Sequence, residues 1–489
     1  MGQTVRLQGH IATERVRHDP YIYLPFDVPA GTSRIHVAYS YSEPATGPFG
    51  MGPGNTVDIG IFDSRGHDFI TAPGFRGWSG SARREFFIGA AEATPGYIPG
   101  PLFPGTWNLL LGAARSGADG VGYDVTITVA NDGRDPPEAS GRTAPGSQLP
   151  ASSEFQAPSS QFQVPNSKRW LKGDLHTHTE HSDGANSVEE IVRNAVEKGL
   201  DFLAVTDHNT ITHHAELERL AGLPIVLIPG EEVTTYWGHA NTWGLREWIE
   251  YRCADEESMA AVREYVHRKG ALLSINHPKS VGPPWLLEGW EGYQAMEVWQ
   301  APWRFHNWES LQRWDGLLDR GHRVVAVGGS DTHSIPPAAP QHPHGIGNPT
   351  TWVYADDPPD ERSILDAISR GHVFISDAPE GPTLILRADA DGDGDYEVLP
   401  GDAIIAGEDE RVRFRVDIHG GMERRLWLIS DGKPLDIIPL MDVDSTSTFT
   451  LQPAGRRYVR AELRGPRGRP ERGEVVWALT NPIWFDSSK

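Results

Sequence analysis

The 489-residue chain contains a single cysteine, Cys253. One thiol cannot form an internal disulfide, and it cannot supply the set of thiolates that a zinc ribbon needs. Any bound metal ion must therefore be held by nitrogen and oxygen ligands. Basic residues are also scarce, because 44 Lys and Arg stand against 66 Asp and Glu, which gives a net charge of −22. A field of this sign repels polyanions, so we expect no long nucleic acid as a partner.

Long apolar runs are absent as well. The N-terminal sequence has no apolar segment behind a basic start, and no window approaches the length that crosses a bilayer. We therefore expect a soluble, cytoplasmic chain with no membrane partner, and the sequence does not indicate its oligomeric state. The length allows about two to four domains. With 16 Trp, 16 Phe and 13 Tyr, the chain has enough apolar material for real cores.

The residue composition and pattern change three times along the chain. Residues 1–132 contain short alternating runs between Gly- and Pro-rich turns, which is typical of a β-sandwich. Residues 133–168 are rich in Pro, Ser, Gly and Gln and indicate a linker. Residues 169–380 alternate apolar strands with amphipathic helices, and residues 381–489 return to the short strands of a small β-domain. We expect a multi-domain protein whose α/β region is flanked by two β-domains.

Periodicity predicts the elements of the α/β region. Strands are expected at 170–176, 202–207, 225–232, 272–277, 295–299, 324–330 and 351–354, and helices near 187–198, 256–268, 308–319 and 360–369. Four helices end in a basic residue followed by a glycine that suits the left-handed C′ position, namely Gly199, Gly270, Gly321 and Gly371. Ser187 and Glu190 predict a capping box. This alternation implies parallel strands, and an α/β barrel keeps its active site at the strand ends.

Histidines and carboxylates gather at the ends of these predicted strands. The segments are GDLHTHTEHSDG (173–184), VTDHN (205–209), PGEEVTTYWGHANTWG (229–244), INHPK (275–279) and GGSDTH (328–333). Alternation along a strand turns His176 and His178 to the same side, where both can bind one cation. The segments supply nine candidate ligands: His176, His178, Asp183, His208, Glu232, His239, His277, Asp331 and His333. One ion takes about four to six ligands, so the number indicates two or three ions that share a carboxylate.

The alternative is that these histidines are ordinary hydrogen-bonded core residues. For one histidine that explanation is the stronger one. Five clusters at successive strand ends would each need a separate explanation, so together they favour a metal centre. The ligands suit zinc, manganese or iron alike.

The motifs HTHTEHSDG, TDHN, GEEVT, NHP and GGSDTH resemble the ordered motifs of the PHP (polymerase and histidinol phosphatase) superfamily. This resemblance implies a distorted seven-stranded (β/α) barrel with a centre of two or three metal ions. The phrases RGWSGSARREFFI, PGYIPGPLFPGTWNLLLG, GHANTWG and DAISRGHVFIS resemble the carbaryl hydrolase (CehA/McbA) branch. That branch implies cleavage of an ester or carbamate, whereas phosphoesterases dominate the wider superfamily.

The resemblance also implies how the ligands are shared. It places His176, His178, Glu232 and Asp331 on a first ion, adds His239 and His277 to Glu232 on a second, and gives Asp183, His208 and His333 to a third. Because neighbouring residues on a strand face opposite ways, only one of Glu231 and Glu232 can face the centre. The family phrase G-x-E selects Glu232.

Such a centre predicts a metal-dependent hydrolase. Two divalent cations lower the pKa of a shared water, so we expect a metal-bridging hydroxide to attack an ester-type bond while the ions stabilise the oxyanion. The chain has no G-x-S-x-G elbow, and a serine nucleophile is unnecessary. A leaving group can still need a proton, for which His208, His306 and His333 are the candidates.

The residues around the motifs leave the substrate class open. Four aromatic residues could wall an apolar pocket or pack the barrel against the β-domains: Tyr236, Trp237, Trp243 and Trp299. Lys279 and Arg304 could bind a phosphate or lie paired at the surface. We favour a carboxylic or carbamate ester of a small molecule. The alternatives are a phosphomono- or phosphodiesterase, and a non-enzymatic carbohydrate- or protein-binding protein whose metals are structural.

Overall fold

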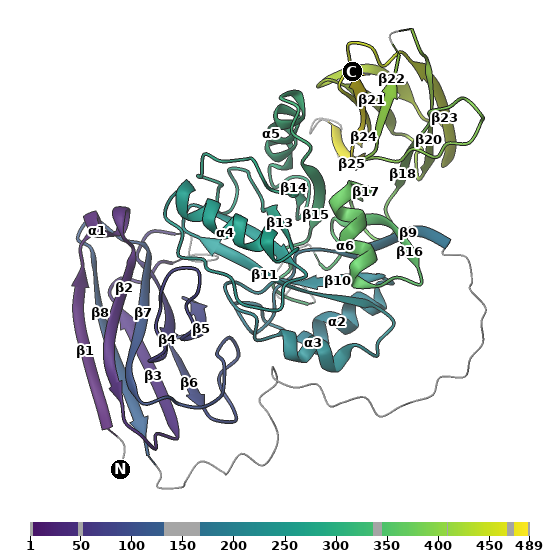
Figure 1. Ribbon diagram of the computed structural model, residues 1–489. Helices are drawn as coiled ribbons and strands as arrows, with labels where there is room; N and C mark the ends of the chain where they lie inside the picture. Colours follow the sequence, from purple (N-terminus) through teal and green to yellow (C-terminus); the bar gives the residue numbers. More distant parts are fainter. Residues whose placement is uncertain are drawn as a thin grey trace, which may run out of the picture.

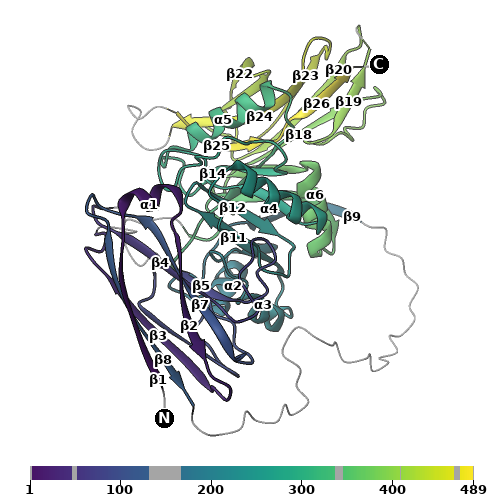
Figure 2. The ribbon, with the colours of Figure 1, turned by 60° about the vertical axis from the view of Figure 1, so that its left-hand side comes forward.

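The structure is a computed structural model (Figure 1) that describes residues 3–46, 52–131, 167–335, 345–407, 409–466 and 474–487. Nearly all of the expected linker, residues 133–168, lies outside the described residues; its last two residues belong to the first central strand. Two views show the N-terminal strands and the C-terminal strands on opposite sides of the central region (Figures 1 and 2).

The N-terminal region consists of two antiparallel sheets. Its elements are β1 (Gln3–Ile11), α1 (Thr13–His18), β2 (Tyr21–Val28), β3 (Arg34–Tyr41), β4 (Thr56–Phe62), β5 (Phe75–Gly80), β6 (Glu85–Gly89), β7 (Gly105–Arg115) and β8 (Val121–Ala130). The sheet orders are β1-β8-β3-β6 and β2-β7-β4-β5. Val37 and Ile127 from the first sheet and Leu109 from the second are fully buried in one shared core. Such packing is what the alternating sequence predicts.

The central region alternates strands and helices. Its elements are β9 (Ser167–Asp174), α2 (Val188–Glu197), β10 (Phe202–Val205), α3 (His214–Leu220), β11 (Val226–Thr235), β12 (Gly238–Trp243), α4 (Glu256–Arg268), β13 (Leu272–Ile275), β14 (Ala295–Gln300), α5 (Asn307–Asp319), β15 (Val325–Gly329), β16 (Thr350–Asp357), α6 (Glu361–Arg370) and β17 (Val373–Ser376). The predicted capping box of Ser187 and Glu190 is confirmed. The four predicted C′ glycines have φ between 66° and 86°, which a residue without a Cβ adopts at little cost.

The sheet of this region is not fully parallel. The strands lie in the order β15-β14-β13-β12-β11-β10-β9-β16-β17, and the pairs β9–β10, β10–β11, β13–β14 and β14–β15 are parallel. The expectation of parallel strands is wrong at β12, because Tyr236 and Trp237 form a two-residue turn that leaves no room for a crossover. Strands β16 and β17 are antiparallel too.

Among the described residues the central sheet does not close into a barrel. No ladder joins β15 to β16 or β17 in this part of the chain. Instead, the Thr351 hydroxyl of β16 donates to Gly328 O of β15 at 2.7 Å and accepts from Gly328 N at 2.8 Å. A side chain therefore takes the place of backbone pairing at this edge. The expected seven-stranded (β/α) barrel is not confirmed, whereas a multi-domain, sheet-rich architecture is.

The described C-terminal region adds nine strands, of which six continue the central sheet and three form a separate sheet. They are β18 (Thr383–Asp389), β19 (Ala403–Ala406), β20 (Val412–His419), β21 (Arg425–Ser430), β22 (Lys433–Pro439), β23 (Asp444–Leu451), β24 (Tyr458–Pro466), β25 (Glu474–Thr480) and β26 (Ile483–Ser487). The ladder between β17 and β25 crosses the proposed boundary at residue 380. Val416 of β20 and Leu463 of β24 share one buried core. None of the helices in the described ranges combines the length and apolar surface that a bilayer crossing requires.

Candidate metal centre

Backbone pairing places the first and last histidine segments side by side. Thr177, just beyond β9, forms a parallel bridge with Thr332, just beyond β15. The His178 amide donates to Thr332 O at 3.0 Å, and the Asp331 amide donates to His176 O at 2.9 Å. The side chains of His176, His178 and Asp331 consequently lie together.

A second bridge brings in the middle segments. His208 forms a parallel bridge with Glu232 of β11. The chain then turns into β12, which carries His239, and the Asn276 amide donates to His239 O at 2.9 Å. His277 follows directly. All five motif segments therefore meet at one edge of the central sheet.

The first donor group has the spacing of a metal site. His176 Nε2 lies 3.0 Å from His178 Nε2, 3.4 Å from Glu232 Oε1 and 3.3 Å from Asp331 Oδ1. His178 Nε2 lies 3.0 Å from Asp331 Oδ1 and 3.6 Å from Glu232 Oε2. Four donors at about 2.1 Å from one tetrahedral cation are about 3.4 Å apart. The side chains are thus spaced to bind one ion without moving far.

The carboxylate of Glu232 is the hub of the cluster. Besides the first two histidines, Oε1 lies 3.2 Å from His239 Nδ1 and 3.3 Å from His277 Nε2, and Oε2 lies 2.6 Å from His208 Nδ1. The side chain is 0% exposed. A carboxylate that directs its oxygens to different imidazoles can bridge two cations.

A third donor group adjoins these two. Asp183 Oδ1 lies 3.3 Å from His333 Nε2 and 3.6 Å from His208 Nε2. This cluster contains three sets of donors, and the ligand atoms within each set all lie within 4.8 Å of one another. The sets are His178, Asp183, His208 and His333; His176, His178 and Glu232; and His208, Glu232 and His239. His178, His208 and Glu232 each belong to two sets, so the sets form one continuous centre.

The electrostatics of the cluster follow from burying opposite charges together. Burial raises the pKa of Glu232, but the imidazoles of His208 and His176 outweigh burial and hold that pKa well below its usual range. Burial lowers the pKa of His208, but the carboxylates of Glu232 and Asp183 outweigh it and raise the pKa to about 9. For His178, burial and two neighbouring imidazoles lower the pKa to about 4. Glu232 as a carboxylate and His178 as a neutral imidazole are in the forms that bind metal ions, whereas His208 has to lose a proton when it binds one.

Two further observations fit a divalent cation at this centre. His178 Nδ1 is buried without a hydrogen-bond partner, which costs about 1–3 kcal/mol. Asn209, His277 and Asp331 have left-handed backbone conformations, with φ of 52°, 29° and 53°. Such strain costs about 1–3 kcal/mol per residue and is concentrated at functional sites.

Two residues that support the donors were not identified from the sequence. Glu297 of β14 accepts a hydrogen bond from His176 Nδ1 at 3.0 Å and from the His277 amide at 2.9 Å. Asn276 Nδ2 donates to Glu232 Oε1 at 2.8 Å. Glu297 had a usable signal, because it is the one acidic residue in the apolar strand AMEVWQ. Asn276 had none.

The structure places the four aromatic candidates in different environments. Trp243 and Trp299 are each 1% exposed, and their indole N–H groups donate to Leu175 O and Ala301 O. Both therefore pack the core. Tyr236 and Trp237 form the turn between β11 and β12 and are partly buried. The Tyr236 hydroxyl donates to Asp58 Oδ2 of the N-terminal region at 2.9 Å.

The other candidates lie outside the three donor sets. Lys279 is 1% exposed, and its Nζ donates to Gln300 O and Asn307 Oδ1, each at 2.9 Å; burial lowers its pKa to about 7. Arg304 is exposed, with its guanidinium 5.1 Å from the centroid of its neighbour's ring. His306 Nδ1 lies 3.0 Å from both Ser280 Oγ and Glu309 Oε1.

Glu231 faces away from the cluster, as strand alternation requires. Its Oε2 accepts a hydrogen bond from the Ile249 amide at 2.9 Å, and burial raises its pKa well above the usual range. Of the two adjacent glutamates, Glu232 alone contacts the histidines described above.

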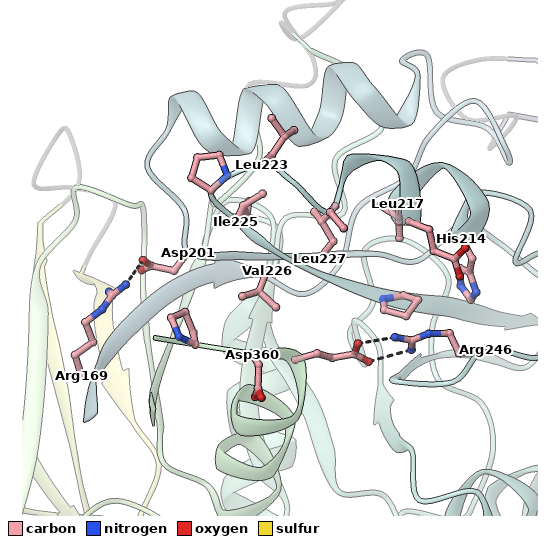
Figure 3. Close-up of a pocket in the computed structure, with 16 residues that line it drawn as sticks. Arg169, Asp201, His214, Leu217, Leu223, Ile225, Val226, Leu227, Arg246 and Asp360 are labelled. Carbon is pink, nitrogen blue, oxygen red and sulfur yellow. Dashed lines mark hydrogen bonds and ion pairs between the residues drawn. The ribbon is translucent and has the colours of Figure 1, made fainter. Parts of the chain in front are cut away.

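A cavity of about 620 Å³ lies elsewhere, against α3, the start of β11 and the start of α6 (Figure 3). Both of its arginines are paired, with Arg169 2.8 Å from Asp201 and Arg246 2.6 Å from Glu361. None of the nine candidate ligands lines it. The candidate metal ligands thus lie in the histidine cluster and not in this cavity.

Residues 174–273 match the PHP domain family. The 5'-3' exoribonuclease Rnm of Escherichia coli is 46% identical over 68 residues, which are 13% of this chain and 23% of that protein. The chain thus spans about a quarter of the length of this relative. A two-domain protein of Bacteroides vulgatus containing a predicted PHP-like metal-dependent phosphoesterase is 18% identical with a TM-score of 0.35, over 64% of this chain and 95% of that one.

An uncharacterized protein of Methanocaldococcus jannaschii is 32% identical over 124 residues, which are 22% of this chain and 69% of that protein. The match to the PHP domain begins at Asp174 and includes His176, His178, Glu232 and His239. The family match shows that the chain contains a PHP domain within residues 174–273.

Proposed function

We propose that this protein is a metal-dependent hydrolase that cleaves a phosphoester of a small molecule. The observation that carries the proposal is that three donor sets share His178, His208 and Glu232. Sets that share ligands hold their cations side by side, which is the arrangement that phosphatases and nucleases use. The similarity of a short segment to a protein named as an exoribonuclease supports the same bond type.

Bound divalent cations would supply a water activated near neutral pH and would polarise the oxygens of the substrate. His176, His178, Glu232 and Asp331 would hold one ion, and Glu232 would extend to a second with His239 and His277. Asp183, His208 and His333 would complete a third set. Glu297 would keep the ring of His176 turned toward the centre.

The exposure of the ligands supports one direction of substrate approach. Asp183 is 40% exposed and His333 is 22% exposed, whereas His178 and Glu232 are fully buried. The substrate would therefore meet the cluster on the side of Asp183 and His333. A side open to solvent also favours an enzyme over the alternative of purely structural metals.

His333 is the better placed of the expected proton donors. Burial lowers its pKa, but the carboxylates of Asp183 and Asp331 outweigh burial and raise the pKa to about 10. With no ion in the third donor set, a histidine that keeps its proton at neutral pH on the open side of the centre can protonate a leaving group; with that ion bound, His333 would serve as a ligand instead. His306 contacts Ser280 and Glu309 instead.

A carboxylic or carbamate ester, as in the CehA/McbA branch, is the second candidate. One observation favours it: neither Lys279 nor Arg304, the cations expected to bind a phosphate, contacts the donor sets. Lys279 instead donates its hydrogen bonds to neighbouring protein oxygens. An uncharged substrate would not need these cations.

Parallel assays separate the candidates. The protein is loaded with Mn²⁺ or Zn²⁺ and given p-nitrophenyl phosphate, bis-p-nitrophenyl phosphate, 1-naphthyl acetate and 1-naphthyl methylcarbamate. We expect turnover of a phosphoester that is lost in His176→Ala. Turnover of the naphthyl esters alone would instead support the second candidate, a hydrolase of carboxylic or carbamate esters. Cation binding without turnover of any of the four would favour a structural role.

A further inference from the structure

The hairpin of β11 and β12 carries two candidate ligands and ends in a two-residue turn. Glu232 lies on one strand and His239 on the other, with Tyr236 and Trp237 as the turn. The Thr235 hydroxyl closes this turn by donating to Gly238 O at 2.7 Å. The turn begins four residues after Glu232 and ends two residues before His239, about 13 Å and about 7 Å along the chain, so a displaced tip would tilt both strands.

The tip is held in a socket formed by the N-terminal region. Tyr21 of β2, Gly112 of β7 and Asp58 of β4 stand opposite one another across three neighbouring strands. The Tyr236 ring stacks on Tyr21 with centroids 5.5 Å apart, and its hydroxyl donates to Asp58 Oδ2 at 2.9 Å. Gly112 leaves the space between them, because an added Cβ there would lie 2.1 Å from the Tyr236 hydroxyl oxygen.

The socket is electrostatically close to the metal centre. Burial raises the pKa of Asp58 to about 6, while the hydrogen bond from Tyr236 and the charge of His208 act against burial. Asp58 is 178 residues distant from Tyr236 in the chain, so no local preference of the hairpin explains the contact.

The two regions have other contacts, so they do not depend on this socket to stay together. Phe75 stacks on Trp248 with centroids 4.2 Å apart. The Ile70 amide donates to Glu250 Oε2 at 3.3 Å, and Arg252 donates to the Tyr23 hydroxyl. A change in the socket can thus be tested in a chain whose domains remain packed.

We propose that the N-terminal β-sandwich positions the metal-binding hairpin, with Tyr21, Asp58 and Gly112 as the socket for Tyr236. The inference rests on the proposed metal centre but not on the bond that it cleaves. It assigns the β-sandwich a part in cation binding, with Tyr236 and Asp58 as positioning residues.

The test is a titration of the metal-free full-length protein with Mn²⁺, followed by calorimetry. Gly112→Ala drives the Tyr236 hydroxyl out of the socket, and we expect about tenfold weaker binding of at least one ion, a typical effect for groups that orient ligands. The matched control is Gly122→Ala in β8, where the added Cβ would lie 3.8 Å from its nearest neighbour. Tyr23→Phe removes an interface hydroxyl outside the hairpin and should also bind as the parent does.

A second variant makes the effect specific. In Gly112→Ala with Tyr236→Phe the clashing oxygen is gone, and we expect Mn²⁺ affinity to recover relative to Gly112→Ala alone. A folded Gly112→Ala with parental affinity would overturn the inference, and so would a loss that Tyr236→Phe does not relieve. If the parent itself binds no Mn²⁺, Zn²⁺ or Fe²⁺, the proposed metal centre fails instead.

Discussion

Glu297 holds the imidazole of His176 from behind, with Oε1 3.0 Å from Nδ1, while Nε2 of the same ring faces Glu232 and Asp331. The second oxygen of Glu297 accepts the His277 amide at 2.9 Å. One buried carboxylate thus orients candidate ligands from two segments. Partners of this kind fix the tautomer and the direction of a metal-binding histidine.

Replacing Glu297 should therefore weaken metal binding without removing a ligand. Glu297→Gln keeps the size of the side chain but loses the charge and one acceptor. We expect about 10- to 100-fold weaker Mn²⁺ binding in a calorimetric titration of the metal-free protein.

The matched control is Glu309→Gln. Glu309 Oε1 also lies 3.0 Å from a histidine Nδ1, that of His306, which is outside the donor sets. This variant should bind Mn²⁺ with parental affinity. Equal affinities for parent and Glu297→Gln would show that the carboxylate has no orienting role.

Cations should stabilise the central region against heat. A ligand that binds the folded state alone adds about 2.7 kcal/mol when present at 100 times its Kd. Unfolding is monitored by tryptophan fluorescence. We expect the midpoint temperature of the first unfolding transition to rise on adding Zn²⁺ or Mn²⁺ and to fall on adding a chelator. His176→Ala should lose most of this response. A multi-domain chain need not unfold in one step, so each transition is compared separately.

Local rules predicted four of the five helices described in the central region and missed the short helix α3. The expected helices at 187–198 and 256–268 are α2 and α4 with bounds that agree to within one residue. Their signals are the apolar period, a capping residue and a C′ glycine such as Gly199, all within one short segment. The five motif segments were found for the same reason, since each is contiguous.

Features that depend on distant packing were not predictable from one sequence. The turn at Tyr236 and Trp237 lacks the Asn-Gly or Asp-Gly signal of a hairpin, so β12 was not predicted. The Tyr236–Asp58 contact joins two regions with unrelated patterns. Trp243 lies within a ligand segment of the sequence, yet its indole is buried in the core. Closure of the barrel was inferred from the family resemblance. At the edge between β15 and β16, the contact is made by the Thr351 side chain and not by backbone pairing.

Acid should destabilise the fold through His214. Burial and then the neighbouring His213 lower the pKa of His214 to about 3, and its Nδ1 is buried without a partner. The unfolded chain binds this proton near pH 6.5 and the folded chain does not, so stability is present above that pH and is lost as pH falls below it. The titration of His214 changes the free energy of unfolding by at most about 1.4 kcal/mol per pH unit.

His214→Gln keeps a donor for Gly230 O and removes the titration. Urea unfolding in the presence of a chelator should show a smaller loss of stability between pH 6.5 and 4.5 than in the parent. Between pH 7.5 and 8.5 both proteins should show the same slope, because His214 is then neutral in both states. Parallel curves across the acid range would contradict the assignment.

The two tryptophans on the β11–β12 hairpin should separate packing from substrate binding. Trp243 is 1% exposed and donates its indole N–H to Leu175 O at 3.0 Å. Trp243→Phe should therefore lower the free energy of unfolding by about 1–3 kcal/mol, because it opens space in the core and leaves Leu175 O with only the 3.4 Å hydrogen bond from Asn241 Nδ2. Once folded, it should keep the KM of the parent.

Trp237 is partly buried at the hairpin tip, and Trp237→Ala should raise KM several-fold for an aryl ester with a smaller effect on stability. The comparison uses urea unfolding together with the steady-state kinetics of whichever ester is turned over. A raised KM in Trp243→Phe at unchanged stability would return that indole to the wall of the substrate site.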